Sequence, residues 1–369
     1  MPDPLDNLHL PDLLAMALEC RASDLHLKVG RPPVLRIDGE LRLTDFEPLS
    51  AAEVRRLANE VMNERLRAEY EQTGGADFAF TLDSGDRFRI NVYRERDMTS
   101  VAVRRVSRDI PDFARLHLPA ETLGRICQAT QGLVIFAGVT GCGKSTSIAA
   151  CLDNINRHRR CHIVTIEDPI EFLFEDADSF VNQREIGTDV PTFELALKSL
   201  MREDPDVVLV GEMRDRETCA TVLRAAETGH LVFTTLHASS APGALLRLLD
   251  LFAAEEHDAI RQSLATNLVA VVCQKLVRGS RADARVVPAT EVLLTAPTVR
   301  ELIRRGEISH LSALIEAGAT AGMYDFTQDL ERLVREDWVE PKDAYEEAPN
   351  PEALKMALKG IAFRQGTLR

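Results

Sequence analysis

The chain has 369 residues, with 44 Lys and Arg against 58 Asp and Glu, which gives a formal net charge of −14 at pH 7. At roughly 150 residues per domain, this length predicts two domains. The balance of 45% hydrophobic and 28% charged residues is typical of a folded protein and excludes a mostly disordered chain. Because non-specific nucleic-acid binders need clustered positive charge, the acidic composition argues against nucleic acid as a partner.

Neither a membrane segment nor a metal or disulfide framework is evident in the sequence. No stretch approaches the ~20 apolar residues of a membrane span, and the start of the chain lacks the basic and apolar regions of a signal peptide. The 7 cysteines form no C-x-x-C pair, so we expect neither a local zinc module nor structural disulfides. We therefore expect a reduced, cytoplasmic chain with no part inserted in the membrane.

Residues 1–110 mix helical and strand-like patterns and predict a small α+β domain. A helix over residues 8–20 is followed by alternating strands at 24–29 and 34–37, and then by the turn Asp38-Gly39. Ser50 and Glu53 form a capping box that opens a helix over residues 51–71. Strands are expected at 87–93 and 99–106, and residues 111–119 between two prolines form a linker.

From about residue 120 the pattern changes to short, continuous apolar runs separated by helical segments. The runs cover residues 133–137, 163–166, 207–210 and 231–235. Such runs are typical of strands that are buried on both faces of a mostly parallel α/β sheet. The most apolar segment, residues 264–277, is expected to be a buried helix. We assign residues 120–290 to the α/β core and residues 291–369 to a helical C-terminal region.

A phosphate-binding loop lies directly after the first of these runs. Residues 138–145 fit the pattern G-x-x-x-x-G-K-[ST], with a strand before and a helix after the loop. The loop amides can hold phosphates, Lys144 can reach the β- and γ-phosphates, and the Ser145 hydroxyl can bind Mg²⁺. ATP and Mg²⁺ are therefore the expected cofactors. The expected binding residues are Gly138, Val139, Thr140, Gly141, Cys142, Gly143, Lys144, Ser145 and Thr146.

Cys142 within this loop has two interpretations. A thiol near a helix N-terminus can serve as a redox sensor if its pKa is lowered. We favour the simpler reading, in which Cys142 is a tolerated small residue.

Acidic and histidine residues flank the other predicted strands. Glu167 and Glu212 each follow an apolar run, and in an open α/β sheet such positions face the ligand crevice. Either carboxylate can act on Mg²⁺ or orient the attacking water, so these roles are interchangeable at this stage. His230 and His237 stand at the two ends of one strand, and either imidazole can donate to the γ-phosphate.

Together these segments resemble the ATPase superfamily that drives type II secretion and type IV pili, and within it the PilT-like pilus retraction ATPases. The Walker A motif resembles residues 138–145, the Asp box residues 165–172, the Walker B motif residues 206–215 and the His box residues 228–237. Residues 23–27, 181–187, 298–306 and 322–330 also resemble segments of that family, so the likeness covers nearly the whole chain.

The resemblance implies a fold and a division of roles. It implies a PAS-like N-terminal domain, a RecA-like ATPase domain and a ring hexamer, with nucleotide bound between the domains. Glu167 resembles the acid that activates water, and Glu212 the acid of the Mg²⁺ shell. His230 and His237 resemble the His-box histidines. The family also uses arginines of the N-terminal domain, and the strand patterns offer Arg89, Arg104 and Arg96 for that role, although the family's usual Arg-Gly is replaced near Arg96.

The resemblance predicts an ATP-hydrolysing motor for pilus retraction and twitching motility, acting through an inner-membrane platform protein. An accessory, PilU-like retraction motor and a pilus extension or type II secretion ATPase are the alternatives. The extension and secretion enzymes usually carry a four-cysteine zinc module, which this chain lacks.

Overall fold

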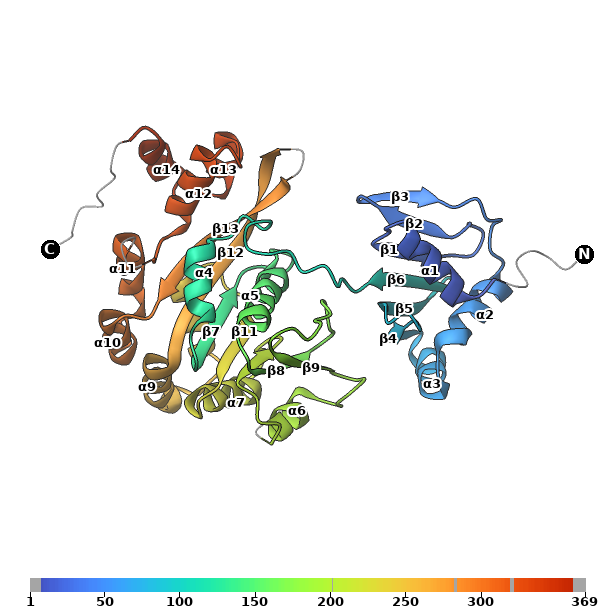
Figure 1. Cartoon of the computed structure of the whole chain (residues 1–369), viewed down its shortest axis with the longest axis horizontal. Helices are drawn as coiled ribbons and strands as arrows, with labels where there is room; N and C mark the ends of the chain where they lie inside the picture. Colours follow the sequence, from blue (N-terminus) through green and yellow to red (C-terminus); the bar gives the residue numbers. More distant parts are fainter. Residues whose placement is uncertain (1–7, 201, 282–283, 319–321, 361–369) are drawn as a thin grey trace, which may run out of the picture. The chain divides into compact units, whose positions relative to one another are not determined.

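The computed structural model describes residues 8–200, 202–281, 284–318 and 322–360. The chain divides into two compact units, Met1–Arg108 and Asp109–Arg369 (Figure 1). Each unit has its own hydrophobic core. Among the described residues, no helix is both long and apolar enough to cross a membrane.

From residue 8 onward, the N-terminal unit is an antiparallel sheet in the order β3-β2-β1-β6-β5-β4, with three helices. Helix α2 packs on β6 and α3 on β4, and the buried leucines of α1 belong to the same core as those of the sheet. The elements are α1 (Leu10–Glu19), β1 (Asp24–Leu27), β2 (Val34–Ile37), β3 (Glu40–Leu43), α2 (Ala51–Val61), α3 (Glu64–Thr73), β4 (Gly75–Thr81), β5 (Arg87–Glu95) and β6 (Met98–Arg105).

Local sequence signals explain most of these boundaries. Asp38 and Gly39 both have positive φ, 52° and 84°, in the turn between β2 and β3. The predicted capping box is present, because Ser50 accepts from the amide of Glu53 and Glu53 accepts from the amide of Ser50. The single helix predicted over residues 51–71 is wrong. Asn63 interrupts it, since its side chain accepts from the amide of Leu66 and so starts a second helix, α3.

In its described part, the C-terminal unit has a seven-stranded sheet in the order β13-β12-β7-β11-β10-β8-β9, in which only β13 runs antiparallel to its neighbour. Its strands are β7 (Gly132–Ala137), β8 (His162–Glu167), β9 (Phe180–Glu185), β10 (Val207–Val210), β11 (Leu231–Leu236), β12 (Leu268–Arg281) and β13 (Ala284–Leu294). Its α-helices are α4 (Ala120–Cys127), α5 (Lys144–His158), α6 (Phe193–Leu200), α7 (Arg216–Glu227), α8 (Ala241–Leu249), α9 (His257–Asn267), α10 (Pro297–Arg305), α11 (Leu311–Ala317), α12 (Phe326–Arg335), α13 (Pro341–Glu347) and α14 (Pro351–Leu358). The predicted α/β class with a largely parallel sheet is confirmed.

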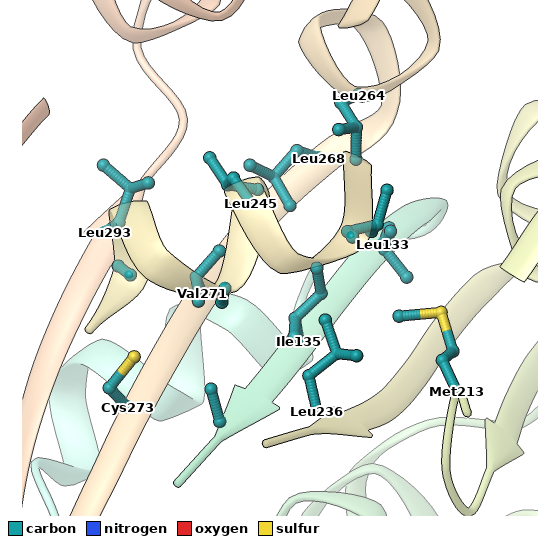
Figure 2. Close-up of a cluster of buried hydrophobic side chains, with 14 of the residues drawn as sticks. Leu133, Ile135, Met213, Leu236, Leu245, Leu264, Leu268, Val271, Cys273 and Leu293 are labelled. Carbon is teal, nitrogen blue, oxygen red and sulfur yellow. The ribbon is translucent and has the colours of Figure 1, made fainter. Parts of the chain in front are cut away.

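The segment over residues 264–277 is not the buried helix that we expected. Helix α9 ends at Asn267, and β12 starts at Leu268 and pairs with β7 in the middle of the sheet. Side chains from both parts of the segment share one core, so burial alone did not distinguish helix from strand. Figure 2 shows this cluster, with Leu264, Leu268, Val271 and Cys273 beside Leu133 and Ile135 of β7.

Candidate functional site

A cavity of about 470 Å³ lies in the C-terminal unit, beside the carboxyl ends of β7, β8, β10 and β11. Because parallel strands end at one edge of the sheet, the loops that follow them meet there. The lining includes Thr140, Gly141, Gly143, Lys144, Ser145, Thr146, Glu167, Asp168, Glu171, Gly211, Glu212, Arg214, Thr235 and His237. The structure therefore brings the phosphate loop together with both predicted acids and one predicted histidine.

The phosphate loop joins β7 to α5 through a backbone that requires glycine. Gly138 has φ 154°, and a Cβ atom there would lie 2.4 Å from the backbone oxygen of Gln274. Gly143 has φ 87°, and a Cβ atom there would lie 2.8 Å from Gln274 Nε2. Six of the nine predicted loop residues, from Thr140 to Thr146 without Cys142, line the cavity. Gly138, Val139 and Cys142 do not, and Val139 points to solvent.

Lys144 lies across its own loop. Its Nζ donates to the backbone oxygens of Gly138 at 2.9 Å and Val139 at 3.0 Å, and its side chain is almost fully buried. Both acceptors are carbonyl groups of the loop, so the ammonium group is held over the loop at the cavity. This placement suits a lysine that neutralises phosphate oxygens.

Cys142 is buried under the loop, which is an unfavourable environment for a sensor thiol. Burial raises the pKa of the Cys142 thiol, and the nearby charge of Lys144 opposes this only in part. A thiol of this kind is mostly protonated at neutral pH and therefore reacts slowly with oxidants. This favours the tolerated small residue over the redox sensor.

Glu167 ends β8 in a buried position with neutral hydrogen-bond donors. Its Oε1 accepts from Thr165 Oγ1 at 2.7 Å and from Gln183 Nε2 at 3.3 Å, and its Oε2 lies 3.5 Å from the amide of Glu171. Burial raises the pKa of Glu167 to about 7, although these donors oppose the shift. A carboxylate with a pKa near the working pH is well matched to accept a proton from water.

Glu212 follows β10 and has a different environment. Its Oε1 lies 3.0 Å from His237 Nε2, and its Oε2 accepts from Arg214 Nε at 2.8 Å. The neighbouring Thr235 hydroxyl donates to the backbone oxygen of Gly211 at 2.7 Å and so fixes the turn that carries Glu212. Each oxygen of this carboxylate therefore meets a nitrogen that can carry positive charge.

The two predicted histidines do not lie together. His237 lines the cavity just after β11, but His230 precedes β11 at the other edge of the sheet. Six strand residues separate them, which is about 20 Å. His230 Nδ1 instead lies 2.9 Å from the backbone oxygen of Ala225, at the end of α7. Within this unit only His237 lines the cavity, and a role for His230 stays a prediction.

The three predicted arginines belong to the N-terminal unit. Arg104 Nε donates to Asp24 at 2.9 Å, and the Arg104 side chain is 72% exposed. Arg89 is its direct neighbour across β5 and β6. Arg96 lies in the turn between these strands, with φ 49°. The role of these arginines at a nucleotide stays a prediction.

Several residues of the site were missed by the sequence analysis. Arg214, Thr165 and Gln183 bond directly to the two acids, and Gln274 bonds to the phosphate loop. Arg214 and Thr165 lie within the motif segments that were quoted, so their position was a usable signal. Gln274 was hidden by the wrong assignment of its segment to a helix.

Ser145 and Glu212 fit the requirements of Mg²⁺. Both offer oxygen ligands at the same cavity. Over the described ranges, no three His, Cys, Asp or Glu side chains are grouped as a metal cluster. Mg²⁺ usually takes only one or two protein carboxylates and completes its shell with phosphates and water, so this donor set is sufficient.

Comparison with known proteins agrees with this site. The family described as type II/IV secretion system protein matches residues 4–350. The chain belongs to this family. It is 38% identical to the type IV pilus retraction ATPase PilT of Pseudomonas aeruginosa, over 94% of this chain and 99% of that protein. It is 37% identical to the type IV pilus ATPase PilU of the same organism, over 94% of this chain and 90% of that protein.

A solved structure agrees as well. The chain matches the crystal structure of the pilus retraction motor PilT with bound ADP, with a TM-score of 0.86 and 39% sequence identity. The match covers 95% of this chain and 99% of the PilT chain. The chain is therefore an ATP-binding ATPase of the PilT/PilU group, and its predicted fold, an N-terminal domain followed by a RecA-like domain, is confirmed. Identities of 37% and 38% do not separate PilT from PilU.

Proposed function

We propose that this ATPase is the subunit of a ring hexamer that powers type IV pilus retraction through an inner-membrane platform protein. One observation carries the chemical part of the proposal, namely that the phosphate loop, Glu167 and Glu212 line one cavity. The likeness to PilT over nearly the whole chain supports the part that concerns retraction.

The proposed reaction is attack of water on the γ-phosphorus of ATP. The new bond joins the water oxygen to phosphorus, the bond to the β-phosphate oxygen breaks, and the products are ADP and phosphate. Glu167 takes the water proton, and Lys144 neutralises charge on the phosphate oxygens. Bound Mg²⁺, held by Ser145 and Glu212, would supply further charge neutralisation at the phosphates. Arg89, Arg104 and Arg96 are proposed to add positive charge from the N-terminal unit.

We propose that the nucleoside occupies a second cavity of about 470 Å³. It shares Gly143 and Thr146 with the first cavity, so it begins where the phosphate loop meets α5. Its walls include the apolar side chains Leu116, Leu276, Val286 and Pro288 together with Arg115 and His117. An apolar slot with a few polar groups is the usual environment for a base and its ribose.

Deleting the gene and counting surface pili tests the direction of the motor. Excess pili that no longer retract are the expected result, and complementation with Glu212→Gln should fail to restore retraction. Excess pili with partial retraction would indicate the accessory, PilU-like role. Cells without pili would refute retraction in favour of an assembly ATPase.

A further inference from the structure

Gln274 connects β12 to the phosphate loop through both ends of its side chain. Its Nε2 donates to the backbone oxygen of Cys142 at 2.7 Å, and its Oε1 accepts from Ser147 Oγ at 2.7 Å. Gln274 is 4% exposed, Ser147 1% and Cys142 2%. One carboxamide is therefore bonded at once to the loop and to the first turn of α5, away from solvent.

The position of this carboxamide matters for the loop amides. In a trans peptide the C=O and N–H groups point in opposite directions. Holding the Cys142 carbonyl toward β12 therefore turns the amide of Gly143 away from β12, and Gly143 lines the phosphate cavity. Several amides that converge in this way form an anion-binding nest.

The phosphate loop and β12 are also packed closely against each other. A Cβ atom on Gly143 would lie 2.8 Å from Gln274 Nε2, so the carboxamide packs directly against the loop backbone. The side chain is fixed from its other end by Ser147, which belongs to the helix that the loop precedes. A buried carbonyl that lost this side-chain donor would favour another peptide orientation.

We propose that Gln274 is a positioning residue for nucleotide binding, whose carboxamide holds the phosphate loop in its anion-binding arrangement. The proposal depends on ATP binding at this loop and not on pilus retraction. Gln274 and Ser147 also line the second cavity, where we place the nucleoside, but neither lines the first cavity, which holds the phosphate loop. The effect of Gln274 on the phosphates therefore passes through the amide that it orients.

Three variants of the full chain test this role. Gln274→Met keeps the length of the side chain but removes both bonds, and Ser147→Ala removes only one of them. Ser179→Ala is the matched control. Ser179 is 4% exposed and its Oγ donates to the backbone oxygen of Arg159 at 2.6 Å. It precedes β9, at the edge of the sheet opposite the phosphate loop. Each variant is titrated with a fluorescent ADP analogue, assayed for KM and kcat, and unfolded by heat without nucleotide.

We expect Gln274→Met to weaken ADP binding and raise KM by about tenfold or more, the effect of losing one or two buried hydrogen bonds. Since the loop holds ground state and transition state alike, kcat at saturation should stay within about twofold. Ser147→Ala should weaken binding by about threefold. Ser179→Ala should lower the unfolding temperature and bind ADP as the wild type does.

Two results would overturn the proposal. One is wild-type ADP affinity in a folded Gln274→Met protein, or in Ser147→Ala if Gln274→Met does not fold. The other is an equal loss of affinity in Ser179→Ala, which would make the effect one of general destabilisation.

Discussion

The acid limb of the pH–rate profile should belong to Glu167. Burial raises its pKa to about 7, so the fraction of ionised carboxylate rises from about a tenth at pH 6 to about nine-tenths at pH 8. If the carboxylate accepts the water proton, kcat/KM should rise about tenfold over this range. Glu171 is the charged neighbour that adds to the shift, and its negative charge also favours the protonated form.

The same burial predicts an effect on stability. The pKa of Glu167 is raised from 4.5 to about 7, so the free energy of unfolding is highest below pH 4.5 and declines as the pH rises toward 7. A shift of this size costs about 3 kcal/mol once the group is ionised. Glu167→Gln has no charge to bury, and should therefore gain up to about 3 kcal/mol at pH 8 and almost nothing at pH 4.

Steady-state kinetics and denaturant unfolding at several pH values measure both effects. Glu167→Gln should lose turnover by about a hundredfold or more and lose the acid limb as well. Glu175→Gln removes an exposed carboxylate of the same loop that does not line the cavity, and it should leave both profiles as in the wild type. A wild-type profile that is flat from pH 6 to 8 would refute the assignment, as would an acid limb that persists in Glu167→Gln.

Three further changes probe other parts of the chain. Cys142→Ser should keep the ATPase rate within about twofold, and wild-type activity should survive hydrogen peroxide, because the buried thiol is mostly protonated. If peroxide inactivated the wild type but not Cys142→Ser, Cys142 would be a redox sensor after all. Asp329 accepts hydrogen bonds from the Thr290 amide, the Thr290 hydroxyl and the Arg332 guanidinium. Asp329→Ala should therefore lower the free energy of unfolding, measured by urea titration, by about 3 kcal/mol. A loss below about 1 kcal/mol would contradict a buried network. Arg104→Ala should slow ATP turnover by orders of magnitude if its guanidinium serves the phosphates, and unchanged turnover would remove Arg104 from the site.

The parallel core was predictable because its signals are local and agree with one another. Four apolar runs became β7, β8, β10 and β11, and the phosphate loop follows β7 as its spacing indicated. The split of one N-terminal helix at Asn63 could also have been found, since asparagine is a strong N-cap residue. Periodicity could not decide whether residues 264–277 form a helix or a strand, because a fully buried strand and a buried helix are both continuously apolar.

That error had a consequence for the site. With residues 268–277 read as helix, Gln274 had no reason to lie beside the phosphate loop. Pairing of β12 with β7 is a contact between distant parts of the chain, and it places Cys273 opposite Ala137, one residue before the loop. The position of His230 is a different case, because the direction of β11 alone puts the two ends of that strand at opposite edges of the sheet.

The structure also bears on the two acids, whose roles the residue pattern left interchangeable. Glu167 is buried among neutral donors, and its pKa near 7 suits a group that must take up and release a proton. Glu212 meets Arg214 and His237, and its neighbour Gly211 is fixed by Thr235. Mg²⁺ prefers oxygen ligands, and the Glu212 carboxylate, which is paired with Arg214 and lines the cavity, is suited to this role. Local environment therefore favours the same division of roles as the family resemblance, and it does so on independent physical grounds.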